Sequence, residues 1–299
     1  MADVFGGLLT LTGLVALSFL IGIIAPLAGV GGGVLFTPIL LGFTSIHPDL
    51  IRSAGLAIAC YSSIMAGTVY FRWRIAPFRL ILLASAVLVP AAIIGAQLGI
   101  HVAALGRWGQ GLIRASLGIV LFIVVVMLSV KRIDWPAPRC NSRLVDVFGL
   151  RYVYHEKTLN RDVEYCPTGL GLAAGLPLLF LIGFGSGFFG LGAAWALIPV
   201  YNLLMGLPLK VAAASASASL AIADTGALWG YILRERFHPE LFISTTLGVI
   251  IGANLGAKLL LKARVKFIRR LILAIMIFNG IQLVNRGLFE MGIMPYRLF

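Results

Sequence analysis

The sequence predicts an all-α polytopic membrane protein made of two homologous repeats, and three observations lead to this fold class. Of the 299 residues, 60% are hydrophobic and 12% are charged, and the mean hydropathy is +1.00. Soluble proteins carry about 25% charged residues because their surfaces face water. The apolar residues also fall into two sets of about five segments. Finally, the second set repeats motifs of the first.

Most of the apolar segments approach the roughly 20 residues that a membrane-spanning helix needs. The second segment of each set is shorter, which predicts a broken or re-entrant helix. The segments occupy residues 8–28, 34–46, 52–71, 78–99, 110–130, 169–189, 193–206, 210–233, 240–260 and 267–285. The first segment lacks a preceding basic region and a cleavage motif, so we expect it to be retained as a span.

The chain is expected to divide into a first transmembrane repeat at 1–131, a connecting loop at 132–167 and a second transmembrane repeat at 168–299. The connecting loop is rich in Arg, Asp, Tyr and Pro, and it is too short for a core of its own. Within it, the run Tyr152-Val-Tyr-His155 is expected to be extended. A linker or a small cytoplasmic cap is the role that this loop suggests.

Two glycine-rich runs carry the similarity between the repeats. The run Gly29-Val-Gly-Gly-Gly33 followed by a proline matches the run Gly190-Leu-Gly-Ala-Ala194 followed by a proline at the same spacing. Further along, Gly95-Ala-Gln-Leu-Gly99 matches Gly252-Ala-Asn-Leu-Gly256. Motifs that return in the same order indicate an internal duplication.

The placement of the basic residues predicts that the two repeats are inverted. The basic loop lies between the third and fourth segments of the first repeat, but between the fourth and fifth segments of the second. Since Lys and Arg gather in cytoplasmic loops, equivalent loops would lie on opposite faces of the cell (inner) membrane, with the central loop cytoplasmic. The net charge of +13 then reports orientation in the lipid bilayer, and no nucleic acid partner is expected. A parallel duplication with a weak charge bias is the alternative.

The glycine runs predict a substrate site where each repeat breaks a helix. Glycine allows the chain to unwind, and the next helix then begins with N–H groups that have no partner inside it. Such a helix start carries partial positive charge and binds anions. Close helix packing through small residues is the alternative. The candidate residues are Gly29, Gly31, Gly32, Gly33, Gly187, Gly190 and Gly192.

Hydroxyl groups in the third segment of each repeat are further candidates, because an oxyanion needs several hydrogen-bond donors without a fixed charge. They are Ser62, Ser63, Ser215, Ser217 and Ser219. The last three share one face only if their segment begins unwound. Helix packing or hydrogen bonding to the preceding turn is the other interpretation.

Asp224 lies inside an apolar segment, and a carboxylate within the membrane is a functional hypothesis because its burial is costly. It is a candidate for proton coupling, for cation binding, or for a hydrogen bond between helices. The first repeat has no matching carboxylate, so this role would be asymmetric. Arg52 and Arg114 lie near the ends of segments, where they either snorkel to the interface or attract an anion.

No motif of a soluble enzyme accompanies these residues, and we expect no enzyme activity. The glycine run lacks the Gly-Lys-Ser/Thr ending of a nucleotide loop, so ATP-driven transport is not predicted. The histidines lie in or near loops and the cysteines lack metal spacing, so we expect no metal, no cofactor and no disulfide framework.

The two glycine motifs, Gly29-Val-Gly-Gly-Gly-Val-Leu-Phe-Thr-Pro38 and Gly187-Phe-Phe-Gly-Leu-Gly-Ala-Ala-Trp-Ala-Leu-Ile-Pro199, resemble the two halves of the TauE/SafE, or sulfite exporter, family. The resemblance covers nearly the whole chain apart from the central loop. It implies secondary transport, with export favoured, of a small sulfur-containing anion such as sulfite, thiosulfate, sulfoacetate or an organic thiolate. Ala193 and Ala194 depart from the pattern, since the second run is usually glycine there.

These observations together predict a permease that binds its anion between two broken helices and exposes it alternately to each face. Two other functions stay open from the sequence alone. One is an ion channel or cation permease that uses Asp224 and unwound carbonyl groups. The other is a membrane scaffold or assembly protein whose 132–167 loop binds a partner.

Overall fold

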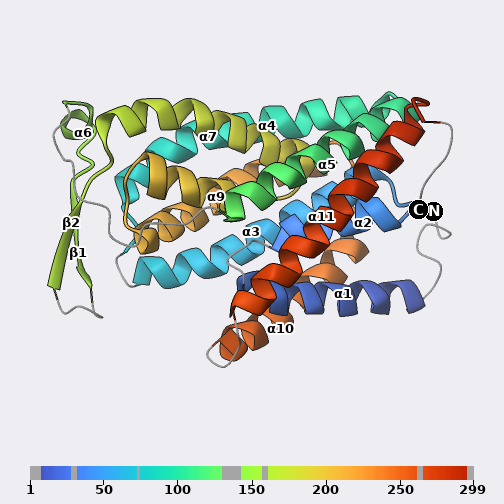
Figure 1. Ribbon diagram of the computed structural model, residues 1–299, viewed down its shortest axis with the longest axis horizontal. Helices are drawn as coiled ribbons and strands as arrows, with labels where there is room; N and C mark the ends of the chain where they lie inside the picture. Colours follow the sequence, from blue (N-terminus) through green and yellow to red (C-terminus); the bar gives the residue numbers. More distant parts are fainter. Residues whose placement is uncertain are drawn as a thin grey trace.

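Helices make up most of the computed structural model, which describes residues 8–27, 32–72, 75–129, 143–156, 161–260 and 265–294 (Figure 1). The helices of the first half are α1 (Leu8–Leu27), α2 (Gly32–Phe43), α3 (Pro48–Arg72), α4 (Phe78–Ala104) and α5 (Arg107–Ser129). Those of the second half are α7 (Gly169–Phe189), α8 (Ala194–Pro199), α9 (Leu209–Leu233), α10 (Pro239–Leu260) and α11 (Val265–Glu290). A π-helical turn, η2 (Val200–Leu204), continues α8.

The prediction of an all-α polytopic membrane protein is confirmed. Within the described ranges, 6 helices are long and apolar enough to cross a bilayer: α3, α4, α5, α7, α9 and residues 272–290 of α11. The second helix of each half is short, as the sequence predicted, with 12 residues in α2 and 6 in α8. That the two halves form inverted repeats stays a prediction.

The connecting segment contains the short helix α6 (Arg143–Val147) and a hairpin of strands β1 (Tyr152–Glu156) and β2 (Arg161–Tyr165). The strands pair antiparallel, with Tyr152 opposite Tyr165, so the expected extended run is confirmed. The sequence predicts no disulfide framework, but Cys166, which is buried after β2, is disulfide-bonded. The spacing of cysteines along the chain could not show this pairing, because it depends on how the segment folds back.

The hairpin lies at one end of the molecule, and the start of α1 and the end of α11 lie at the other (Figure 1). Helix α7 runs into the bundle from the hairpin end, and α8 with η2 runs back towards that end. The Thr168 N–H before α7 donates to the carbonyl of Met205 after η2 at 2.9 Å, which closes this pair. The short helix of the second half is therefore re-entrant.

Helices of one half pack mainly against helices of the other. Helix α4 packs along α7, and helix α1 packs along α10. Glycines allow both contacts: a methyl group added to Gly183 would lie 2.8 Å from the Leu88 carbonyl oxygen, and one added to Gly248 would lie 2.5 Å from that of Val15. Backbones that approach this closely are typical of helix packing in membranes.

Helices α5 and α11 cross through a reciprocal pair of glycines. A methyl group on Gly111 would lie 2.7 Å from the carbonyl oxygen of Gly287, and one on Gly287 would lie 2.5 Å from that of Gly111. Gly118 approaches the carbonyl of Gly280 in the same way, at 2.7 Å. The two backbones are in direct contact, with no side chain between them.

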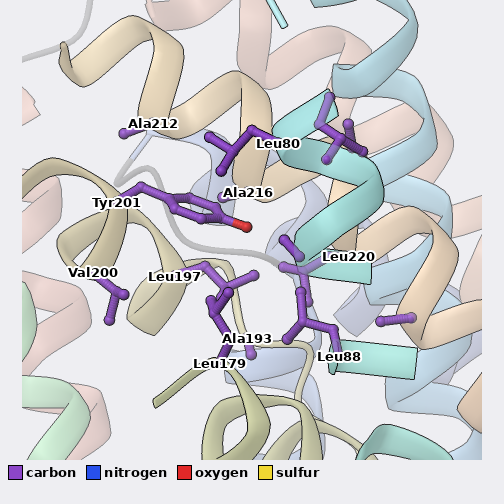
Figure 2. Packing of buried hydrophobic residues seen from close by; sticks show 14 of the residues in the cluster. Leu80, Leu88, Leu179, Ala193, Leu197, Val200, Tyr201, Ala212, Ala216 and Leu220 are labelled. Atoms are coloured by element: carbon purple, nitrogen blue, oxygen red, sulfur yellow. The ribbon is translucent and has the colours of Figure 1, made fainter. Parts of the chain in front are cut away.

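A buried apolar cluster fixes the end of the re-entrant pair against α4 and α9 (Figure 2). Tyr201 is its largest member from η2, with a fully buried ring that reaches towards Ala216 in Figure 2. Its hydroxyl group lies 3.3 Å from Ser219 Oγ, so the polar end of the ring has a partner. The Asn202 side chain donates to the carbonyl of Leu207 at 2.8 Å, which stabilises the turn into α9.

Candidate functional site

The break between α7 and α8 meets the start of α2 inside the protein. Helix α7 ends at Phe189, α8 begins at Ala194, and the linking residues Gly190 and Gly192 have φ of 68° and 66°. These positive values favour glycine because other residues are strained there. A methyl group added to Gly33, in the first turn of α2, would lie 2.5 Å from the carbonyl oxygen of Leu191. The two glycine motifs of the sequence therefore come together.

A hydrogen bond fixes α2 to this break. Thr37 Oγ1 donates to the carbonyl of Gly190 at 2.7 Å, and both groups are buried. Gly190 also lies against the backbone of α3, since a methyl group there would be 2.6 Å from Arg52 Cα. Helices α2, α3 and α7 thus approach one another as closely as their backbones allow.

Asp224 lies next to the same break and is fully buried. Its Oδ1 accepts a hydrogen bond of 2.7 Å from Ser186 Oγ in the last turn of α7. Its Oδ2 has no hydrogen-bond partner among the described residues, and a methyl group on Gly192 would lie 3.4 Å from it. A buried carboxylate with one oxygen free of partners is costly unless it takes up a proton or meets a ligand.

A second polar pair lies between α3 and α9, and it involves Thr225, the residue directly after Asp224. The sulfur of Cys60 is 3.0 Å from Thr225 Oγ1, and Cys60 is a free, buried thiol. Thr225 also donates to the carbonyl of Ala221 at 2.6 Å. Cys60 and Thr225 therefore extend the polar surface around Asp224 towards the crossing of the two helices.

Arg52 holds the end of α7 from the other side. Its Nη1 donates to the Phe188 carbonyl at 2.7 Å and its Nη2 to the Gly99 carbonyl at 3.0 Å, and it forms an ion pair with Asp49. Its guanidinium carbon is 5.6 Å from the ring centre of Tyr231. A cation over an aromatic face is stabilised by the ring quadrupole.

Tyr231 completes this cluster, because its hydroxyl group donates to the carbonyl of Gly187 at 3.1 Å. Two residues from α3 and α9 thus satisfy carbonyl groups at the end of α7 that have no partner inside the helix. Of the two alternatives for Arg52, snorkelling to the interface is wrong, since the side chain is 0% exposed. Burial is possible because the two terminal nitrogens of the guanidinium group meet two carbonyl groups and a carboxylate, and the Tyr231 ring lies beside it.

The predicted glycines fall into three groups in the structure. Gly33, Gly190 and Gly192 lie where the first turn of α2 meets the break between α7 and α8. Gly32 packs against Ile58, and Gly187 packs against α4 at Ala92. The remaining two lie outside the described residues; they are Gly29 and Gly31.

The predicted serines are not gathered in one place. Ser62 and Ser217 donate to carbonyl groups of their own helices, at 2.9 Å and 3.0 Å, and Ser63 is buried. Ser219 faces Tyr201, and Ser215 is buried with no hydrogen-bond partner for its hydroxyl group among the described residues. Helix α9 is regular from Leu209, so its start is not unwound and the three serines do not share a face.

A cavity of about 500 Å³ borders this centre on the side of α5, and its lining is almost wholly apolar. Ser186 and Gly192, which contact Asp224, both line it. So do Ile123 of α5 and Leu181 of α7, which are largely exposed on the surface of the bundle. The cavity therefore connects the neighbourhood of Asp224 with the outer face of α5 and α7.

No group of three or more His, Cys, Asp or Glu side chains that could hold a metal ion occurs in the described part of the chain. The polar groups at the break are instead backbone groups, the hydroxyl groups of Thr37 and Ser186, and the carboxyl group of Asp224. Such a set can bind a small anion and exchange a proton.

Sequence reasoning missed Thr37, Ser186 and Tyr231. Ser186 directly precedes the second glycine motif, as the middle residue of Gly-Ser-Gly, and a hydroxyl beside a helix break was the available signal. In the sequence alignment of the two halves, Tyr231 matches Tyr70. Nothing in the local sequence of Thr37 distinguishes it from a packing residue.

Comparison with known proteins adds two findings to this geometry. Residues 14–283 match the family model described as "Sulfite exporter TauE/SafE". The chain is also similar to a "Probable membrane transporter protein YunE" of Bacillus subtilis (strain 168), with 21% identity over 93% of this chain and 98% of the relative. No solved structure matches the chain.

Proposed function

Because this chain belongs to the sulfite exporter TauE/SafE family, we propose that it is a secondary transporter which carries a small sulfur-containing anion across the membrane. The observation that carries the proposal is the close approach of Gly33, in the first turn of α2, to Leu191 in the break between α7 and α8, inside the protein. In a membrane, non-helical backbone is tolerated where it is buried in protein or lines a cavity, and transporters place substrate there. The candidate substrates are sulfite, thiosulfate, sulfoacetate and organic thiolates.

The start of α2 supplies the attraction for the anion. Its first residues, from Gly32 to Leu35, are buried, and the N–H groups of a first helical turn have no partner inside the helix. The same end carries about half a positive charge from the aligned peptide dipoles. The loop from Gly190 to Ala193 adds backbone N–H groups from the other half of the protein.

The packing of the two halves supports alternating access. The contact of α4 with α7 has a counterpart in the contact of α1 with α10, as expected if the halves are related by a two-fold axis in the membrane plane. Between the halves, the Cys60 sulfur of α3 faces the Ala221 carbonyl of α9 at 3.8 Å. Rocking of one half against the other would expose the centre first to one face and then to the other.

Asp224 is the group that we propose to couple transport to protons. A carboxylate beside an anion repels it, so the centre holds both only when Asp224 is protonated. Its free Oδ2 would then become a hydrogen-bond donor towards the loop at Gly192. One proton and one anion would therefore bind together and leave together.

Transport by the purified protein in liposomes tests the proposal. Labelled sulfite, thiosulfate, sulfoacetate and a small organic thiolate are offered separately, with and without an imposed pH gradient. We expect saturable, gradient-dependent accumulation of at least one of them, and none in liposomes without protein. Absence of saturable movement for every anion would rule the proposal out.

A cation permease is the second candidate, and one observation favours it. The carboxylate of Asp224 meets no cation among the described residues, and the carbonyl oxygens of Leu191 and Gly55 lie near Gly33. Carboxylate and carbonyl oxygens are ligands for hard cations. In the same liposomes, a current that follows a sodium or potassium gradient without any sulfur anion would support this alternative.

The orientation and the domain division remain part of the proposal. We place the hairpin face on the cytoplasmic side of a cell membrane. This face includes the end of α3, with Arg72, and the start of α4, with Arg79. The residues before 132 and after 167 would form the two transport repeats. The hairpin between them would act as a cap on the cytoplasmic face, and export is favoured by the name of the family alone.

A further inference from the structure

A second cavity, of about 290 Å³ and with a polar lining, lies at the end of the molecule opposite the hairpin. Three segments that are distant in sequence form it: the turn after α2, the first two turns of α5 and the last turns of α11 (Figure 1). Its lining consists of Ser45, Arg107, Gln110, Arg114, Arg286, Phe289 and Glu290. This composition is unlike that of the apolar cavity beside Asp224.

The cavity carries an excess of positive charge. Three arginines line it and one carboxylate, Glu290, opposes them. Glu290 pairs with Arg114 and also with Arg286, whose Nε lies 3.1 Å from its Oε1. One carboxylate thus offsets two buried guanidinium groups. The first residues of α5 add the partial positive charge of a helix start.

Two of the arginines also hold the end of α2. Arg114 Nε donates to the Leu41 carbonyl at 3.3 Å, and Arg286 Nη1 donates to the Gly42 carbonyl at 2.8 Å. Arg114 is therefore not at a snorkelling position, since it is 2% exposed and bonded to a neighbouring helix. These contacts keep two positive charges in place beside the cavity.

Arg107 differs from these two arginines. It is exposed at the start of α5 and has no hydrogen bond or ion pair with another described residue. Ser45 and Gln110 place a hydroxyl group and an amide in the same cavity. An exposed guanidinium group in the same cavity as a fixed pair of arginines is a suitable arrangement for an oxyanion, because guanidinium forms two parallel bonds to oxygen atoms.

We propose that this cavity is a second anion site, which binds a small oxyanion such as sulfate or sulfite at the face opposite the hairpin. Arg107 and Gln110 contact the oxyanion, while the buried Arg114 and Arg286 supply positive charge at the inner wall of the cavity. The site is separate from the centre at Asp224, and it goes beyond the proposed transport function. Helix α2 connects the two, since its first turn reaches Leu191 and its last carbonyls bind the arginines.

Sulfate binding to the purified protein tests the site directly. The protein is placed in nanodiscs of uncharged lipid, and sulfate is titrated by calorimetry at constant ionic strength with chloride as the competing anion. Arg107→Gln should raise the Kd for sulfate about tenfold, which is the loss of one charge-assisted contact. Arg107→Glu should abolish binding at this site, and both variants should fold because the side chain is exposed.

Arg234 provides the matched control. It is exposed at the end of α9, outside the lining of the cavity. Arg234→Gln and Arg234→Glu make the same changes of charge and should leave the Kd for sulfate unaltered. Equal effects at the two positions, or no effect at Arg107, would overturn the proposal.

The same titration shows whether the bound anion is a transported substrate or an oxyanion that is not transported. If a transported sulfur anion displaces sulfate and Arg107→Gln raises the KM of transport with unchanged kcat, the site is an entrance for substrate. If only sulfate or phosphate binds, the ligand is an oxyanion that is not transported. Because binding is measured at equilibrium, failure of the transport proposal would leave this result standing.

Discussion

Ser186 donates a hydrogen bond of 2.7 Å to Asp224 in the fully buried centre of the protein, and this bond joins the last turn of α7 to the middle of α9. The acceptor is a carboxylate whose other oxygen has no partner among the described residues. The end of α7 at the break is thus linked directly to Asp224, the residue proposed to bind a proton.

Replacing Asp224 with Asn should remove the dependence of transport on a pH gradient. Asn keeps the shape of the side chain and an oxygen that accepts from Ser186, but it cannot exchange a proton. The measurement is anion accumulation in liposomes with and without the gradient. Gradient-driven accumulation that survives in the variant would show that the proton is carried elsewhere.

Replacing Ser186 with Ala should lower the free energy of unfolding by about 1 kcal/mol, because a buried hydrogen bond is lost and Asp224 is left unsatisfied. Ser217→Ala is the matched control, since that hydroxyl group bonds only to Ala213 in its own helix. The control should change stability by less than about 0.5 kcal/mol. Thermal unfolding in detergent compares the two variants, and equal losses would contradict the assigned role of Ser186.

Replacing Gly190 with Ala should be far more harmful than replacing Gly106 with Ala. Both residues have positive φ, 68° and 77°, so both variants incur backbone strain of about 1 kcal/mol. A methyl group on Gly190 would also collide with α3 near Arg52, whereas one on Gly106 meets nothing within 4 Å. The difference in melting temperature and in transport between the variants therefore measures the close approach alone.

Replacing Arg52 with Gln should destabilise the protein by about 3 to 5 kcal/mol, because Asp49 is then buried without its main partner. Adding Asp49→Asn should restore part of this loss. Residues in one network are coupled, so the two effects should not add. Unfolding of both single variants and the double variant tests this, and simple additivity would show that the ion pair contributes little.

The orientation of the protein can be tested with single cysteines in a background without native cysteines. Val153 in β1 is 57% exposed, and Leu105 between α4 and α5 is 64% exposed at the opposite end. We expect a membrane-impermeant maleimide to label Leu105→Cys in intact cells and Val153→Cys only after permeabilisation.

The reverse labelling would place the hairpin outside the cytoplasm. The disulfide of Cys166 would then lie in an oxidising compartment, where such bonds persist. The distribution of basic residues would in that case not determine the orientation of this chain.

The sequence predicts the helical framework well, because the length of each apolar segment and the glycine breaks are local properties. The break from Gly190 to Ala193, the short helix after it and the position of Asp224 in a long helix all follow from such local patterns. The partners of Asp224 and Arg52 do not follow from local patterns, since Ser186 and Phe188 both lie on α7, far away in the sequence. Which helix faces which is decided by packing across the whole bundle.

The serines show a second reason why the sequence predicts the helices better than the candidate site. A candidate site at Ser215, Ser217 and Ser219 required an unwound start of α9, but the alanine-rich sequence from Leu209 forms a regular helix. Helix propensity and the buried contact of Ser219 with Tyr201 then place the hydroxyl groups on different sides. A pattern of residue types predicts available donors, but not the direction in which a helix presents them.

The glycine pair between α5 and α11 restricts how the two halves can move. Gly111 and Gly287 each lie against the carbonyl of the other, so sliding along either helix would drive a side chain such as Ala115 into the opposing backbone. Rotation about the crossing point keeps the contact. We therefore expect α5 and α11 to rotate about this glycine pair as a fixed pivot. The largest displacements should then occur at the helix ends that lie furthest from it.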